Sequence, residues 1–170
     1  QATKGHYLSL AHSQKPLAML ITCVDSRIMP EQLLGLNAGE IFCLRNIASL
    51  VPKDDPATTS AIEYAVCHLN IRNIVVLGHS NCGGINALTK NSSSNHIKMW
   101  LDPWHNSVKK WLTMPHSDEQ HHCQEQAVLE SIKNIKNMQF ISENVNLHAW
   151  HLDIASAKIS ELNPETNKFV

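Results

Sequence analysis

The sequence predicts an α/β fold, with a mostly parallel sheet of about four or five strands flanked by helices and an antiparallel edge strand. Three observations lead to this prediction. Short apolar, β-branched runs end abruptly in polar residues, as buried parallel strands do. Segments with helical periodicity alternate with these runs, and no internal repeat interrupts the order. We therefore expect a single domain over residues 1–170.

The first half of the chain alternates helix and strand. Proline disfavours helical geometry in the residue before it and suits the first turn of a helix, so Pro16 follows the first helix and Pro30 begins the second. An apolar stripe from Ile62 to Leu69 marks the third helix. The expected elements are a helix at 4–14, a strand at 17–24, a helix at 29–38, a strand at 40–46, a helix at 58–70 and a strand at 73–78.

The second half is less regular. Gly83 and Gly84 open a helix whose first backbone N–H groups favour an anion. The later expected elements are a Trp-rich helical stretch at 97–112 that Asp102-Pro103 interrupts, a polar loop at 116–122, an amphipathic helix at 124–138, a strand at 146–154 and an edge strand in the tail.

Composition excludes several function classes. The formal net charge is −1 with mixed signs, which favours neither nucleic acid nor an acidic membrane surface as a partner. No apolar run approaches the roughly 20 residues of a membrane span, and no secretory signal is visible. The chain begins at Gln1 rather than at a Met, so removal of an upstream targeting segment stays an alternative.

The five cysteines do not form a disulfide framework, because their number is odd and two of them belong to the site described next. A reducing compartment, the cytoplasm, is therefore expected. Cys43 and Cys67 fall in apolar elements, where a free thiol behaves as a small hydrophobic group. Cys123 stands in a polar stretch and is expected to be the exposed one.

Two strand ends carry residues typical of a metal site. Cys23 follows the first expected strand, and His79 and Cys82 follow the third. In an open α/β sheet, active sites lie beyond the carboxyl ends of the strands, so these side chains should converge. Two thiolates and one imidazole bind Zn²⁺ and leave one coordination position open, which is the catalytic pattern. The sequence therefore predicts a zinc enzyme with one zinc ion per chain.

Asp25 and Arg27 flank the first predicted ligand. Arg27 can hold the carboxylate in a bidentate grip, which keeps Asp25 ionised and fixes its orientation beside the metal. The alternative is a structural salt bridge that caps a turn. A Cys-x5-Arg phosphatase loop would need arginine where Met29 stands, and a papain-like pairing of Cys23 with His79 leaves Cys82 unexplained.

Four motifs, in this order and spacing, resemble the β-class carbonic anhydrases. The motifs are Cys-x-Asp-Ser-Arg from Cys23, Phe-x-x-Arg-Asn-Ile-Ala from Phe42, Ala-Ile-Glu-Tyr-Ala-Val from Ala61 and Gly-His-Ser-Asn-Cys-Gly-Gly from Gly78. The resemblance is specific over residues 14–88 and looser over 124–170, and the amino-terminal arm before Gln14 is short or missing relative to the family.

The resemblance implies a carbonate dehydratase, a lyase that interconverts CO₂ and bicarbonate through a zinc-bound hydroxide oriented by the Asp25–Arg27 dyad. It implies a substrate pocket from Gln14, Phe42, Ile47, Tyr64, Gly83 and Gly84. Family clefts lie between subunits, so a homodimer that pairs into a tetramer is implied as well. The alternatives are a hydrolase of a related heterocumulene such as CS₂ and a non-catalytic, zinc-stabilised protein.

Two finer expectations follow from the resemblance. His68 lies four residues after Tyr64 on one helix face and matches a histidine of plant-type members, so it is the expected proton shuttle, with a surface histidine as the alternative. Members that close their site and bind bicarbonate allosterically carry a Trp at the position of Leu20. We therefore expect the plant-like, open form without an allosteric bicarbonate site.

Overall fold

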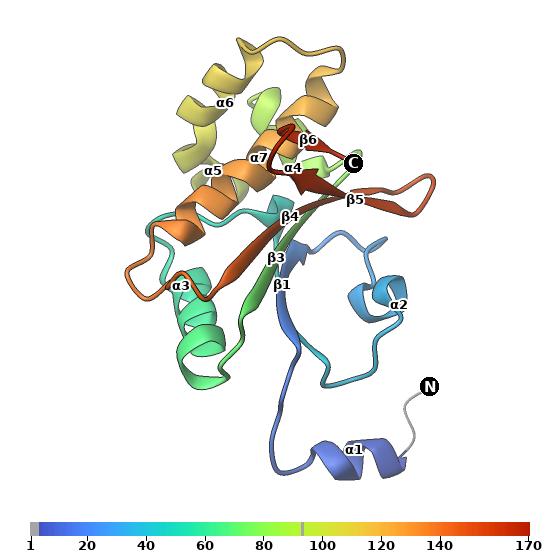
Figure 1. Cartoon of the computed structure of the whole chain (residues 1–170). Helices are drawn as coiled ribbons and strands as arrows, with labels where there is room; N and C mark the ends of the chain where they lie inside the picture. The colour runs from blue at the N-terminus through green and yellow to red at the C-terminus, as the bar shows by residue number, and fades with distance from the viewer. Residues whose placement is uncertain (1–3, 93) are drawn as a thin grey trace.

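One mixed β-sheet organises the protein in the computed structural model, which describes residues 4–92 and 94–170. Within these residues the sheet has six strands in the order β2-β1-β3-β4-β5-β6 (Figure 1). Strands β1 to β4 pair in parallel, and β5 and β6 are antiparallel to their neighbours. The strands are β1 (Ala18–Cys23), β2 (Ile41–Asn46), β3 (Asn73–His79), β4 (Asn146–Asp153), β5 (Lys158–Asn163) and β6 (Lys168–Phe169). The predicted fold class is confirmed, and the short β6 adds to the expected antiparallel edge.

The strand order creates a switch point between β1 and β3. After β1 the chain moves to one side of the sheet to form β2, and it then returns to the other side of β1 to form β3. Such a reversal opens a crevice at the carboxyl ends of the two strands, which is where α/β proteins place their ligands. The ends of β1 and β3 therefore meet where the sequence predicts the metal site.

The two faces of the sheet carry separate apolar cores. Successive side chains of a strand point to opposite faces, so Met19 and Ile21 belong to one cluster and Leu20 to the other. Helix α3 and the turn η2 cover the first face, together with part of α7. Helix α2 lies on the opposite side of the sheet from α3 (Figure 1), and the second cluster extends from that face into α4, α5 and α6, which lie at the carboxyl ends of the strands. There Trp104 and Trp111 pack against each other with ring centroids 6.2 Å apart. The tryptophans are therefore core residues.

The helices follow the predicted order with shifted ends. They are α1 (Lys4–Leu10), α2 (Pro30–Leu34), α3 (Pro56–Glu63), α4 (Gly83–Thr89), α5 (Asn95–Leu101), α6 (His105–Leu112) and α7 (Glu119–Lys136), with 3-10 turns η1 (Ile47–Ser49) and η3 (Asp102–Trp104) and the π-helical turn η2 (Tyr64–His68). The expected helix at 58–70 is thus α3 followed by η2, and Asp102-Pro103 does interrupt the Trp-rich stretch.

Helix α7 begins earlier than predicted, and this corrects the expectation for the cysteines. Asp118 caps the helix by accepting a hydrogen bond from the N–H of His121, so much of the expected loop at 116–122 is helical. Cys123 consequently lies on the inner face of α7 and is fully buried. Cys43 and Cys67 are exposed instead, because β2 is the edge strand of the sheet and η2 lies at the surface.

Helix α1 stands off the body of the protein (Figure 1). It has no buried residue, and Tyr7 and Leu8 are 59% and 64% exposed. Its contacts with the body include His6 Nε2, which donates to the carbonyl of Ala38, and Leu10, which packs against Gly39. The chain therefore presents an apolar helix surface to solvent at this end of the sheet.

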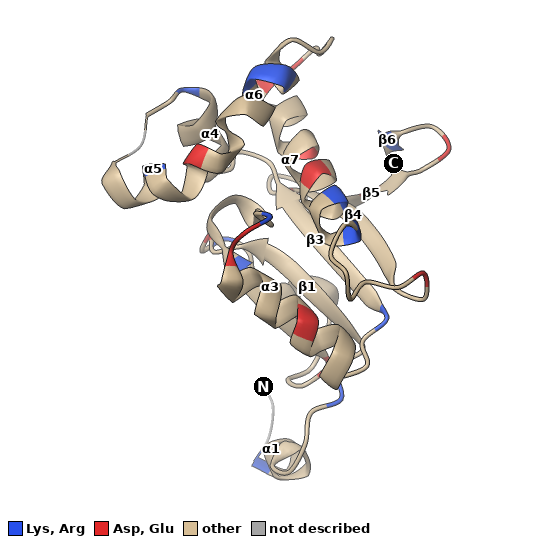
Figure 2. Cartoon of the chain, turned by 90° about the vertical axis from the view of Figure 1, so that its left-hand side faces the viewer, with Lys and Arg blue, Asp and Glu red and all other residues tan. Residues whose placement is uncertain are grey.

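Figure 2 shows that basic and acidic residues are interspersed over the elements. Within the described residues, no helix combines the length and apolar character that crossing a membrane requires.

Candidate metal centre

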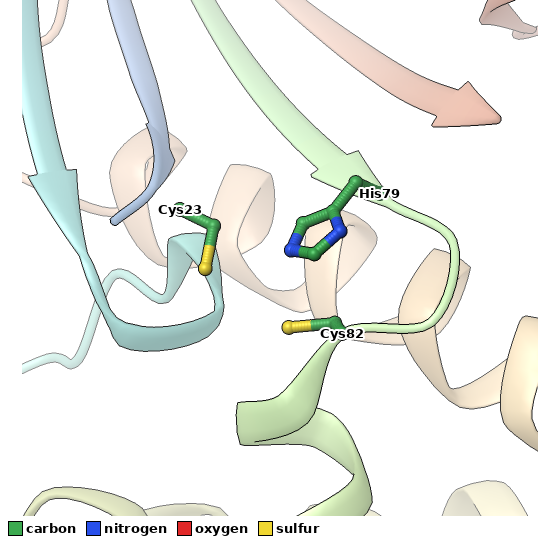
Figure 3. A group of neighbouring side chains, drawn as sticks. All are labelled: Cys23, His79 and Cys82. Carbon is green, nitrogen blue, oxygen red and sulfur yellow. The ribbon is translucent and has the colours of Figure 1, made fainter. Parts of the chain in front are cut away.

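Three buried side chains converge at the carboxyl ends of β1 and β3 (Figure 3). Cys23 is the last residue of β1, His79 is the last residue of β3, and Cys82 is the N-cap residue of α4. Their possible ligand atoms all lie within 4.8 Å of one another. This is the set that the sequence predicts, and the structure brings all three residues together.

The imidazole of His79 is oriented for metal binding. Its Nδ1 lies 3.0 Å from the carbonyl oxygen of Ser80. A carbonyl only accepts hydrogen bonds, so Nδ1 carries the proton and Nε2 presents a lone pair. Nε2 is buried and has no hydrogen-bond partner among the described residues. A buried polar atom without a partner is costly, and a metal ion at this position would satisfy it.

The two thiols complete a donor set that fits zinc. The two thiols interact, and this interaction lowers the pKa of Cys23 and raises that of Cys82. A thiolate at this position is stabilised by a bound cation. The N–H of Ala48 also lies 3.4 Å from Cys23 Sγ and donates to it. Soft sulfur and imidazole ligands favour Zn²⁺ over oxygen-seeking cations, so the residues present form a Cys-His-Cys zinc site.

A close contact between η1 and α4 delivers that N–H group. Ala48 and Ser49 have left-handed backbones, with φ of 68° and 58°. A Cβ on Gly84 would lie 2.7 Å from Ile47 Cγ2 and 2.9 Å from Ala48 Cβ, so only glycine lets η1 approach the start of α4. Gly83 has no such neighbour within 4 Å. The predicted substrate contact of these two glycines stays a prediction.

Asp25 and Arg27 form a bidentate ion pair beside the ligands. Arg27 donates from Nε to Oδ1 over 2.9 Å and from Nη2 to Oδ2 over 2.7 Å. These hydrogen bonds hold the pKa of Asp25 well below its usual range. Arg27 also donates to the carbonyl of Asn81, which ties the pair to the loop between His79 and Cys82. Oδ2 of Asp25 lies 4.0 Å from His79 Nε2, so an ionised carboxylate stands next to the ligand cluster.

Arg45 is a contributor for which the sequence analysis predicts no role. It donates from Nε to the carbonyl of Cys23 over 3.1 Å and from Nη2 to the carbonyl of Asp25 over 2.9 Å. It thereby fixes the backbone that carries one metal ligand and the carboxylate. The available signal was an arginine that follows four apolar residues in strand β2, opposite Thr22 of β1.

The residues predicted for the substrate pocket divide into two groups. Ile47 lies in η1 beside the metal ligands, and its carbonyl accepts a hydrogen bond from Trp100 Nε1 over 3.0 Å. Phe42, Tyr64 and His68 form a separate group, which we call the aromatic cluster. The Phe42 and Tyr64 rings lie 6.0 Å apart, and Tyr64 stacks on His68 at 5.3 Å.

The aromatic cluster and Gln14 lie toward the other end of the sheet. Phe42 is opposite Met19 in the register, four residues before Cys23, which corresponds to about 13 Å along a strand. Gln14 is exposed and precedes the start of β1, whereas Cys23 ends it. One copy of the chain therefore places these predicted residues apart from its own metal ligands.

Comparison with known proteins gives consistent matches. The family model described as carbonic anhydrase matches residues 18–159. Beta carbonic anhydrase 5 (chloroplastic) and beta carbonic anhydrase 3 of Arabidopsis thaliana are each 36% identical to this chain and cover 82% of it. The chain spans 50% and 59% of their respective lengths. A structure of tetrameric beta-carbonic anhydrases from Sordaria macrospora is 30% identical, with a TM-score of 0.84 over 94% of this chain and 87% of the other.

Proposed function

This chain belongs to the β-class carbonic anhydrases, and from that premise we propose that it interconverts CO₂ and bicarbonate at a zinc ion held by Cys23, His79 and Cys82. The position of Asp25 beside the metal ligands is the main support for this proposal. Asp25, an ionised carboxylate held by Arg27, lies 4.0 Å from the buried ligand nitrogen His79 Nε2, so an anionic hydrogen-bond acceptor adjoins the metal position.

Zinc, when bound, supplies a Lewis acid that lowers the pKa of water. Asp25 then accepts a hydrogen bond from the nucleophilic oxygen and so directs its lone pair toward the carbon of CO₂. Arg27 keeps Asp25 ionised and fixes its orientation, since both carboxylate oxygens accept from the guanidinium. Because two thiolates donate more charge than two imidazoles, a zinc ion held by Cys23, His79 and Cys82 would be a weaker Lewis acid, and the hydrogen-bond acceptor at Asp25 would matter more.

In the proposed hydration one C–O bond forms, one O–H bond of water breaks, and the electron pair of one C=O π bond of CO₂ moves onto its oxygen. The water oxygen adds to CO₂, and the product is bicarbonate plus a proton that must reach the buffer. We propose His68 for this transfer, because it is an exposed histidine stacked on Tyr64. Ile47 offers the apolar surface that a linear, weakly polar substrate requires, and the N–H groups of Gly83 and Gly84 would favour the anionic product.

We also propose that the working protein is a dimer with shared clefts, which pairs further into a tetramer. Gln14 and the aromatic cluster lie about a strand length from the metal ligands of their own chain, so a second copy is needed to supply them. The exposed apolar surface of α1 and of Tyr64, which is 45% exposed, is suited to this contact. The Sordaria macrospora relatives are described as tetrameric.

Two further expectations remain proposals. The open form is supported by the engagement of both Asp25 oxygens with Arg27, which leaves the carboxylate outside the three-residue ligand group. A cytoplasmic, reducing location is supported by five free cysteines, of which two are the buried metal ligands Cys23 and Cys82.

The experiment is stopped-flow CO₂ hydration by the zinc-loaded protein from about pH 6.5 to 9, since metal-activated water ionises in this range. We expect fast turnover that rises with pH through a single ionisation. Activity that appears only at high pH with a steep, cooperative onset would contradict the open form. Absence of hydration with zinc still bound would contradict the proposed function, and CS₂ hydrolysis would then be assayed on the same sample.

A further inference from the structure

The loop between two metal ligands is held by neighbouring elements. Ser80 and Asn81 connect His79 to Cys82, and Asn81 has a left-handed backbone with φ of 54°. The end of β4 holds the first half of this loop, because Ser80 N–H donates to the carbonyl of Leu152 and Ser80 Oγ accepts from the N–H of Ile154. A different element holds the second half.

Gln124 reaches this loop from helix α7. Its side chain is 3% exposed, and its amide orientation follows from the groups around it. With the nitrogen facing the carbonyl of His79 it donates over 3.1 Å, and its oxygen accepts from the N–H of Asn81 over 3.2 Å. The opposite orientation would place oxygen against oxygen and N–H against N–H. The amide therefore spans the loop, with one hydrogen bond to the backbone on each side of Ser80.

His151 supports the same orientation from β4. The Gln124 nitrogen also lies 3.2 Å from His151 Nε2, to which it donates. His151 is 2% exposed, and burial lowers its pKa to about 4, so the ring is neutral and can accept at Nε2. The His151 ring packs edge-on against the ring of His121, with ring centroids 4.7 Å apart. Both donor positions and the acceptor of the Gln124 amide are thus satisfied.

We propose that Gln124 is a positioning residue for the metal centre, which fixes the backbone at His79 and Asn81 and so sets the separation of the ligands His79 and Cys82. It does not contact the metal position itself. Loss of its hydrogen bonds would let the left-handed loop relax and would move Cys82 relative to His79. The inference rests on the metal site of the proposed function, but it concerns metal retention and not turnover.

The test compares two substitutions of buried polar residues on the same helix. Gln124→Met removes the loop contacts at nearly constant volume. Asn134→Leu removes a hydrogen bond of similar burial, from Asn134 Nδ2 to the carbonyl of Val51, at a site without metal ligands. Both variants should lose thermal stability. We expect only Gln124→Met to lose zinc affinity, by about 10- to 100-fold in competition with a chromophoric chelator.

A spectrum separates positioning from general destabilisation. In the cobalt(II)-substituted proteins, the ligand-field and thiolate charge-transfer bands should shift in Gln124→Met and remain unchanged in Asn134→Leu. A zinc affinity and a cobalt spectrum that are the same in the two variants would overturn the proposal. If the unsubstituted chain takes up no zinc, the proposed function fails and the inference fails with it.

A measurement on the unsubstituted protein covers the case in which Gln124→Met does not fold. The backbone N–H of Asn81 should exchange with solvent slowly in the zinc-loaded protein, because the Gln124 oxygen accepts from it. Exchange at the rate of an exposed loop amide would show that this hydrogen bond does not form, and it would overturn the proposal.

Discussion

The side chains at the two ends of the parallel strands differ in how far one chain buries and orients them. At the carboxyl ends, Cys23, His79 and Cys82 are 5%, 1% and 2% exposed, and neighbouring backbone and side chains orient them. Toward the amino ends, the aromatic cluster lies at the surface, and its Tyr64 is 45% exposed. The metal ligands are therefore preorganised by a single chain, whereas the proposed substrate surface lies exposed on it.

Removal of a buried metal ligand should have the strongest effect. Cys82→Ser removes one of three metal ligands and replaces a soft donor by a weak one. We expect loss of stoichiometric zinc and a fall of CO₂ hydration to background, measured by metal analysis and stopped flow. Cys43→Ser alters an exposed cysteine away from the ligand set and serves as the control. Full zinc content in Cys82→Ser would contradict the assigned site.

Substitution of Asp25, beside the metal ligands, should affect catalysis without affecting metal binding. Asp25→Asn keeps the shape of the side chain but removes its charge, so it can no longer act as the proposed anionic acceptor. We expect a loss in kcat of about 100- to 1,000-fold with zinc retained.

Arg27→Lys is the graded companion to Asp25→Asn. Lysine keeps the positive charge but loses the bidentate geometry, so a smaller loss in kcat is expected. Equal activity of Asp25→Asn and the unsubstituted enzyme would reduce the pair to a structural salt bridge.

Substitution of Tyr64 in the exposed aromatic cluster should have a smaller effect, on association and not on folding. Tyr64→Ala removes a half-exposed ring, so the free energy of unfolding of one chain should change by less than about 1 kcal/mol. If the aromatic cluster meets a partner, the dimer dissociation constant should rise about tenfold. Sedimentation velocity over a concentration series measures the second quantity. Met99→Ala, at a side chain that is 70% exposed on α5, is the matched control.

The smallest effect concerns the proton transfer proposed for His68. His68→Ala should lower turnover a few-fold in dilute buffer and leave it unchanged when small buffer molecules are abundant, because the buffer then carries the proton. Stopped-flow rates at several buffer concentrations test this expectation. Equal turnover of His68→Ala and the unsubstituted protein in dilute buffer, with no rescue by excess buffer, would mean that His68 is only a stacking partner of Tyr64.

The metal centre was largely predictable because its signals are local. An apolar run fixes where each strand ends, and Cys23 and His79 stand at those ends, so the parallel sheet brings them together. The start of α7 was mispredicted because the polar composition of residues 116–122 indicated a loop. Asp118 instead caps a helix that begins at Glu119. With that start, helical spacing turns Cys123 inward. The exposure of Cys43 was mispredicted because no local pattern shows that β2 is an edge strand.

The fold class, the three metal ligands and the pairing of Asp25 with Arg27 could be predicted from the amino-acid sequence alone, because each depends on periodicity, on a strand end or on residues close in the chain. The residues that hold these ligands and this ion pair in place became evident only from the folded chain. Arg45 and Gln124 reach the site from β2 and α7, and their hydrogen bonds depend on elements that lie 20 or more residues away along the chain. The folded chain also showed that Phe42 and Tyr64 lie apart from the metal ligands, since strand register sets that distance.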